Sequence, residues 1–268
     1  MSDQPAPKRD AAIVESLEGS TLVLTMFNPD RRNAFTPEMR VDMAARIDAG
    51  YANNAVRAIV IRGEGGHFSA GADVSRIPIA EPPTPIQLLE RIKGAHGLVR
   101  SIALGTKPVI AAVEGIATGG GIALAIAADY VVVAEDAKLV PNFTSLGITA
   151  EFGLFATLPR RVGHHAAKRI IMLSERFTGP EAVAIGMADE VAPSGGTLAA
   201  ALEVAKRYAA IPPLALAATK RAFAAPMNSI EDALRHELDI MPALGQSADF
   251  REAIAAFKEK RAPNFSGR

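Results

Sequence analysis

The first half of the chain alternates between short runs of β-branched and apolar residues and longer stretches with helical spacing. Val14–Leu17 and Thr21–Met26 flank the turn residues Glu18-Gly19-Ser20, which predicts a β-hairpin over residues 11–28. Further strands are expected at 56–61, 108–113 and 130–134, the second of them almost wholly apolar, as buried strands are. A helix is expected to start at Thr36-Pro37-Glu38, with an apolar stripe at Met39, Met43, Ile47 and Tyr51. A second helix is expected after residues 76–86 and ends at about Ala103, and a third follows the triple glycine at 119–121 and ends at Ala128.

This alternation favours an α/β core with parallel strand pairing. From about Thr197 the pattern becomes helical only, so we divide the chain into a core over 1–196 and a helical region over 197–268. Thr178-Gly179-Pro180-Glu181 and Asp249-Phe250-Arg251-Glu252 each predict a helix start.

Composition narrows the function classes. Lys and Arg number 29 and Asp and Glu also 29, so net charge does not direct the protein to nucleic acid or to an anionic membrane. No apolar run reaches the roughly 18 residues of a membrane span, and Met1 to Asp10 lack the apolar segment of a secretory signal. There is no cysteine, which excludes disulfides and a thiol nucleophile. We expect a cytoplasmic protein.

Three segments carry the chemistry. They are Phe68-Ser69-Ala70-Gly71-Ala72-Asp73, then 107–115 running into Ala117-Thr118-Gly119-Gly120-Gly121, and Ala255–Arg261 near the C-terminus. The triple glycine is neither a P-loop, because no Gly-Lys-Ser/Thr follows, nor a spaced dinucleotide motif. No Gly-x-Ser-x-Gly elbow is present. The adjacent His164 and His165 would face different sides of a helix, so no metal site is expected.

In this order and spacing, the segments resemble the crotonase superfamily, the enoyl-CoA hydratase/isomerase family. Asn28-Pro29 to Asn33-Ala34-Phe35, Leu158-Pro159-Arg160 to Gly163, and Pro213 to Thr219-Lys220 also match, so the resemblance covers about residues 11–265. It implies a spiral core of ββα turns, a helical C-terminal trimerisation region, and a homotrimer or homohexamer. It also implies stabilisation of an acyl-CoA enolate, with coenzyme A entering as part of the substrate thioester and no prosthetic group.

By motif position, the backbone N–H groups of Ala72 and Gly120 would bind the thioester oxygen, and such donors contribute about 3–4 kcal/mol each to catalysis. The resemblance also implies coenzyme A contacts for Arg31 or Arg32, Ala70, Ala72, Asp73, Phe257 and Lys260, the last two acting mainly on a neighbouring subunit. Asp73 is expected to cap or to pair ionically.

The two glutamates of the family's hydratases are absent, because Ala123 and Phe143 stand at their positions. Glu151, in Ala150-Glu151-Phe152-Gly153, resembles the acid of Δ3,Δ2-enoyl-CoA isomerases and related phenylacetate-pathway isomerases. We expect Phe143, Phe152, Leu154 and Phe155 to surround it and make it a better base. The alternative is that Glu151 is an N-cap or first-turn acid of the following helix. Asp129 is expected to anchor a strand, and Glu114 to end a strand near the active-site rim.

The sequence therefore favours a double-bond isomerase of enoyl-CoA with Glu151 as sole acid/base. Hydration or another crotonase reaction with atypical residues is the alternative within the family. A non-catalytic acyl-CoA-binding subunit is the alternative from another class, motivated by the loss of both hydratase glutamates.

Overall fold

The computed structural model describes residues 10–73, 80, 83–225 and 229–268. The strands are β1 (Ala12–Glu18), β2 (Thr21–Phe27), β3 (Ala58–Gly63), β4 (Val109–Val113), β5 (Ile116–Thr118), β6 (Tyr130–Ala134), β7 (Lys138–Val140), β8 (Phe177–Thr178) and β9 (Glu190–Ala192). The α-helices are α1 (Pro37–Ala52), α2 (Pro85–Leu104), α3 (Gly120–Ala127), α4 (Leu154–Val162), α5 (His164–Leu173), α6 (Gly179–Ala184), α7 (Thr197–Ala209), α8 (Pro213–Ala224), α9 (Ile230–Gly245) and α10 (Ala248–Glu259). Short 3-10 turns span Pro29–Arg31 (η1) and Thr144–Leu146 (η3).

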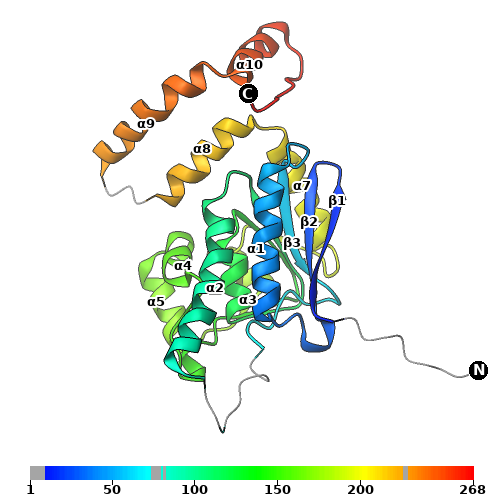
Figure 1. Cartoon of the computed structure of the whole chain (residues 1–268), viewed down its shortest axis with the longest axis vertical. Helices are drawn as coiled ribbons and strands as arrows, with labels where there is room; N and C mark the ends of the chain where they lie inside the picture. The colour runs from blue at the N-terminus through cyan, green and yellow to red at the C-terminus, as the bar shows by residue number, and fades with distance from the viewer. Residues whose placement is uncertain (1–9, 74–79, 81–82, 226–228) are drawn as a thin grey trace, which may run out of the picture.

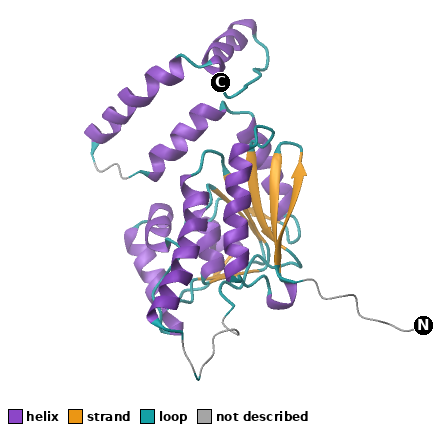
Figure 2. Cartoon of the chain, viewed as in Figure 1, coloured by secondary structure: helices purple, strands orange, loops and turns teal. Residues whose placement is uncertain are grey.

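The main sheet has six strands in the order β1-β2-β3-β4-β6-β9. The β1–β2 hairpin is antiparallel and every other pair in this sheet is parallel, as the alternating pattern predicted. A second sheet of three short strands, β5-β7-β8, lies beside it and carries the segment that leads into α3. The helices form layers around these sheets (Figure 2).

The two faces of the main sheet bury alternate residues of the same strands. Leu24, Ile59 and Ile61 pack in the larger apolar cluster, together with residues of α1, α2 and α3. Val23 and Val60 face the other way and pack against α7. Because successive strand side chains point to opposite faces, strands buried on both sides read as continuous apolar runs. Each large side chain buried in this way contributes about 1.5–3 kcal/mol.

The helix starts follow the capping rules, with one correction. The Thr36 hydroxyl accepts from the Met39 N–H at the start of α1, and Thr178 and Glu181 form the predicted capping box of α6. Helix α10, however, begins at Ala248 with Ser247 as its N-cap, so the predicted start at Asp249 was wrong by two residues. The Asp249 carboxylate instead accepts N–H bonds from Ser266 and Gly267, and so fixes the chain end against α10.

The C-terminal region is helical as predicted. Helix α7 packs on the sheet, whereas α8, α9 and α10 extend beyond it (Figure 1). Helix α8 is tied to the core by the Lys220 ammonium, whose Nζ lies 2.6 Å from Asp129 Oδ2 and 2.9 Å from the Lys107 carbonyl oxygen. Asp129 also accepts the Val109 N–H, which confirms it as an anchor of the buried strands. Among the described helices, none is long and apolar enough to cross a membrane.

Candidate active site

The segment that carries Ala72 lies between two neighbouring backbones. On one side the Ser69 N–H donates to the Ile116 carbonyl, and the Thr118 N–H donates to the Ser69 carbonyl. On the other side the Phe35 N–H donates to the Gly71 carbonyl at 2.7 Å, and the Asp73 N–H donates to the Phe35 carbonyl at 3.4 Å. Since successive backbone groups of an extended segment point to opposite sides, the N–H of Ala72 points away from Phe35.

Gly120 is the first residue of α3. Gly119 before it has φ 51° and ψ −120°, a conformation open only to glycine, which turns β5 sharply into the helix. The first bond of α3 runs from the Ala123 N–H to the Gly119 carbonyl, so the N–H of Gly120 precedes it and needs a partner outside the helix. Donors at a helix start also carry the positive end of the helix dipole, which favours an oxyanion.

Glycines allow the two donor segments to touch. A Cβ on Gly71 would lie 2.7 Å from the Thr118 oxygen and 2.9 Å from the Gly120 nitrogen, and a Cβ on Gly121 would lie 2.4 Å from the Ser69 oxygen. The Thr118 hydroxyl also donates to the Ala70 carbonyl at 3.0 Å. The Gly71 segment, which leads into Ala72, therefore lies against the start of α3, where Gly120 stands.

Asn33 anchors this site. The sequence analysis included it in a segment that matches the family but assigned it no role. The side chain is fully buried, accepts the Asn28 N–H, and donates to the carbonyls of Glu64 and His67. The Ser69 hydroxyl donates to the Asn33 carbonyl at 2.7 Å. The Asn28–Phe35 segment thereby holds the Ala72 segment in place.

The turn that carries Glu151 is strained. Phe152 has φ 55° and Gly153 has φ 71°, and such a left-handed conformation is uncommon for a bulky residue and is often found at functional sites. The turn closes with a bond from the Leu154 N–H to the Glu151 carbonyl. Helix α4 starts at Leu154 with Gly153 as its N-cap and has no acid in its first turn. The alternative interpretation of Glu151 as a helix-capping acid was therefore wrong.

The Phe152 ring packs against Phe35 and Gly120 and so holds this turn next to the start of α3. It is 1% exposed and stacks on Phe35 with ring centroids 6.1 Å apart. A Cβ on Gly120 would lie 2.9 Å from the same ring, so Gly120 leaves the space that Phe152 fills. Glu151, half-buried, thus directly precedes a residue wedged between Phe35 and Gly120.

The four apolar residues expected around Glu151 differ in burial. Phe143, Phe152 and Leu154 are buried, whereas Phe155 is 59% exposed and so does not belong to the buried core. Ala123 and Phe143, which occupy the positions of the hydratase glutamates, are both buried in the main apolar cluster.

Arg40 is a charged residue of this region that the sequence interpretation missed. It lies on α1 and is 3% exposed. Burial and the nearby Arg91 lower its pKa, whereas Glu151 and Glu38 act in the opposite direction. A signal was present: positions 40, 43 and 47 have the spacing of one helix face, so an arginine stands in an apolar stripe.

Other predicted residues have structural roles or lie elsewhere. The Glu114 carboxylate accepts N–H bonds from Gly195 and Thr197, which places it at the start of α7 rather than in catalysis. Arg31 is an exposed residue of η1, and the Ala70 N–H donates to the Arg32 carbonyl next to it. Phe257, 85% exposed, and Lys260 lie at the end of α10, away from α3 of the same chain (Figure 1).

No group of three or more His, Asp or Glu side chains among the described residues has a metal-binding arrangement. His164 and His165 begin α5 as neighbours in sequence.

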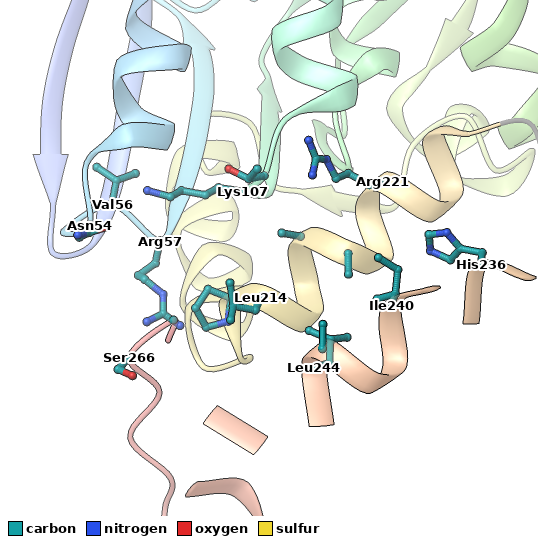
Figure 3. Close-up of a pocket in the computed structure, with 16 residues that line it drawn as sticks. Asn54, Val56, Arg57, Lys107, Leu214, Arg221, His236, Ile240, Leu244 and Ser266 are labelled. Carbon is teal, nitrogen blue, oxygen red and sulfur yellow. The ribbon is translucent and has the colours of Figure 1, made fainter. Parts of the chain in front are cut away.

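A cavity of about 740 Å³ is lined by residues of the core, of α8 and of α9 (Figure 3). Its wall includes Arg57, Lys107, Leu214 and Ile240, and none of Ala72, Gly120 and Glu151. The Arg57 guanidinium donates hydrogen bonds to the carbonyl oxygens of Ala209, Ile211 and Phe265. This cavity is therefore distinct from the candidate active site.

Comparisons with known proteins agree with this geometry. The family model described as enoyl-CoA hydratase/isomerase matches residues 16–268. The 1,2-epoxyphenylacetyl-CoA isomerase of Escherichia coli is 32% identical over 96% of this chain and 98% of its own length. The 2,3-dehydroadipyl-CoA hydratase of the same organism is 31% identical over 96% and 99%. The crystal structure of an enoyl-CoA hydratase from Polaromonas sp. JS666 superposes with a TM-score of 0.90 at 35% identity, covering 95% of this chain and 99% of that one. The chain belongs to the enoyl-CoA hydratase/isomerase family, the crotonase superfamily that its sequence resembled.

Proposed function

We propose that this acyl-CoA enzyme is a Δ3,Δ2-enoyl-CoA isomerase in which Glu151 is the sole acid/base. The observation that supports this most strongly is the Phe152 wedge, which fixes the Glu151 turn against the Gly120 donor. Glu151 is neither the N-cap nor a first-turn acid of α4, so helix capping does not occupy its carboxylate.

The reaction needs one carboxylate and one oxyanion hole. Glu151 removes a proton from C2 of a 3-enoyl-CoA, and the electron pair moves onto the thioester oxygen to give a dienolate. The N–H groups of Ala72 and Gly120 stabilise that oxygen. The protonated acid then returns the proton to C4, which leaves the double bond between C2 and C3. No atom is gained or lost, and no water has to be activated.

Buried apolar residues argue against hydration by a pair of carboxylates. Ala123 and Phe143 are 0% and 3% exposed and lie in the apolar core. Neither can hold or activate a water molecule, because neither side chain has a polar atom.

Hydration remains the second candidate, favoured by the names of relatives such as the 2,3-dehydroadipyl-CoA hydratase. It would require Glu151 alone to activate the water. The name of the 1,2-epoxyphenylacetyl-CoA isomerase, a relative whose identity to this chain is similar to that of the hydratase, favours an isomerase. A non-catalytic acyl-CoA-binding subunit is the third candidate.

The test follows absorbance of the conjugated thioester with purified protein on 3-hexenoyl-CoA and, separately, on 2-hexenoyl-CoA. We expect the first to become conjugated and the second to remain unhydrated. Glu151→Gln is expected to lower kcat about 10²–10⁴-fold, the usual contribution of a general acid/base. Glu135→Gln, in an exposed turn, is the control and keeps full activity.

Each rival has its own signature. Rapid hydration of 2-hexenoyl-CoA would establish the second candidate. Tight binding of hexanoyl-CoA without turnover of either substrate would establish the third. Equal activity of the wild type and Glu151→Gln would remove Glu151 from the mechanism.

The proposed assembly is a homotrimer or homohexamer without a prosthetic group, in the cytoplasm. Large apolar residues on the outer helices support it: Leu238 on α9 is 76% exposed and Phe257 on α10 is 85% exposed. In such an assembly Phe257 and Lys260 would reach a neighbour's coenzyme A. Sedimentation velocity gives the mass of the assembly, and a monomer at micromolar concentration would contradict it.

A further inference from the structure

The peptide unit between Ala70 and Gly71 is held at both of its polar groups by side-chain hydroxyls. Its carbonyl oxygen accepts a hydrogen bond from the Thr118 hydroxyl at 3.0 Å. Its N–H donates to the Ser69 hydroxyl oxygen at 3.1 Å. Ser69 is fully buried, and its hydroxyl donates in turn to the Asn33 carbonyl at 2.7 Å. One peptide unit therefore has two hydroxyls as partners, one from its own segment and one from the end of β5.

Gly71 is the flexible joint of this segment. It has φ +81°, and a Cβ would lie 2.7 Å from the Thr118 carbonyl oxygen, so glycine is required here. Glycine is also the residue whose own backbone is least restricted, so it does not by itself fix the peptide units on its two sides. Contacts from outside have to fix them. The two hydroxyls hold the unit before Gly71, and the Phe35 N–H, which donates to the Gly71 carbonyl at 2.7 Å, holds the unit after it.

These contacts set the direction of the Ala72 N–H. In a trans peptide the N–H points opposite to the carbonyl of the same unit, so the Ala72 N–H points away from Phe35. Within the described part of the chain it donates to no acceptor, and Ala72 is only half-buried. A donor whose direction is fixed before the ligand binds stabilises developing charge without the cost of reorganisation.

We propose that Ser69 and Thr118 are positioning residues of the thioester site. Their hydroxyls fix the peptide unit before Gly71, and thereby the direction in which the Ala72 N–H meets the thioester oxygen. This inference rests on the proposed function for the role of Ala72. Thr118 lies two residues before Gly120, so its hydroxyl bond also ties the Ala72 segment to the start of α3.

The experiment measures the infrared C=O stretch of hexanoyl-CoA that carries carbon-13 at its carbonyl carbon, free in solution and bound to the protein. This saturated thioester binds without isomerising. Hydrogen bonds to the thioester oxygen polarise the carbonyl and lower the frequency of the stretch, so the shift on binding reports how well the donors are aimed. We expect a shift to lower frequency with the wild type.

Thr118→Val keeps the shape of the side chain and removes the hydroxyl, and it should lose at least half of that shift. Ser69→Ala should do the same. In both variants we expect the affinity for hexanoyl-CoA to stay within about threefold of wild type, while kcat on 3-hexenoyl-CoA falls about 10–100-fold, since misplacement of a group acts on the reacting geometry more than on binding. If Ser69→Ala does not fold, because Ser69 is buried, Thr118→Val still decides the question.

Two controls separate the hydroxyls from general destabilisation. Thr118→Ser retains a hydroxyl and should retain the carbonyl shift. Tyr51→Phe removes a largely buried hydroxyl that donates to the Ser101 carbonyl at 2.6 Å. It lies at the other end of α1 from Phe35, roughly 20 Å along the helix axis. This variant should lose stability and keep the carbonyl shift of wild type.

An unchanged carbonyl shift in Ser69→Ala and Thr118→Val would overturn the positioning role. Loss of the shift in Thr118→Ser or in Tyr51→Phe would overturn it as well, because the hydroxyls of the site would then not be its cause. Turnover distinguishes this inference from the proposed function. A carbonyl shift that depends on both hydroxyls, in a protein that does not isomerise 3-hexenoyl-CoA, would keep the positioning pair and remove the isomerase. Isomerisation with a carbonyl shift that is independent of the hydroxyls would do the reverse.

Discussion

Replacement of Gly71 by alanine tests whether the Ala72 and Gly120 N–H groups form the oxyanion hole. Gly71 has φ +81°, and its new Cβ would lie 2.7 Å from the Thr118 oxygen and 2.9 Å from the Gly120 nitrogen. Ordinary contact begins near 3.4 Å, so the two segments must separate by about 0.5–0.7 Å. That displacement acts directly on the distance between the two donors.

The expected cost in stability is moderate and the cost in rate is large. The left-handed conformation costs an alanine about 1–2 kcal/mol, and overpacking adds about 1–3 kcal/mol. Both together remain below the 5–15 kcal/mol by which domains are usually stable, so we expect a folded protein. Loss of one oxyanion donor lowers kcat about 10²–10³-fold.

The assay combines kcat on 3-hexenoyl-CoA, the affinity for hexanoyl-CoA and urea unfolding. Gly66→Ala is the matched control, because Gly66 has φ +77° and nothing within 4 Å of the added Cβ. It should lose stability through backbone strain alone and keep its kcat. A folded Gly71→Ala protein with kcat within about threefold of wild type would refute the assignment of this donor pair.

Three further perturbations follow from named contacts. Phe152→Ala removes the ring that lies between Phe35 and Gly120. It should lower the free energy of unfolding in urea by about 3–5 kcal/mol and abolish most of kcat. A destabilised variant with the kcat of wild type would show that the ring does not position Glu151. Lys220→Met leaves the largely buried Asp129 carboxylate without its cation and should cost about 3–5 kcal/mol, an effect that a small shift in the urea midpoint would contradict. The pKa of Glu252 is lowered to about 2, mainly by hydrogen bonds from the Arg261 side chain and next by the hydrogen bond from the Asn264 N–H. A lowered folded-state pKa stabilises the protein above the unfolded value of about 4.5, and this stabilisation is lost as pH falls through about 2. The melting temperatures of wild type and Glu252→Gln should therefore differ at pH 7 and converge as pH approaches 2. A constant difference across that range would exclude Glu252 as the source.

Local patterns in the sequence determined the elements of this protein. The alternation of apolar residues set the strands, since side chains such as Val60 and Ile61 must enter opposite cores. Thr36 and Thr178 set helix starts through bonds that span three residues. The order of the glycine-containing segments carried the family resemblance, which predicts Ala72 and Gly120 as the donor pair, and glycine permits the close backbone approach that such a site needs.

Tertiary contacts decided what each acid and base does. Glu151 and Glu114 both stood near predicted turns, yet only the structure shows that Glu114 holds the start of α7 and that Glu151 precedes a wedged aromatic ring. Arg40 looked like any helical arginine until α1, α2 and the Glu151 turn came together around it. Propensity and capping act over a few residues, whereas burial, charge proximity and steric wedging join residues more than a hundred positions apart. The sequence therefore determined the fold and predicted Ala72 and Gly120 as candidate donors, and the packing of distant segments determined which side chains lie near them.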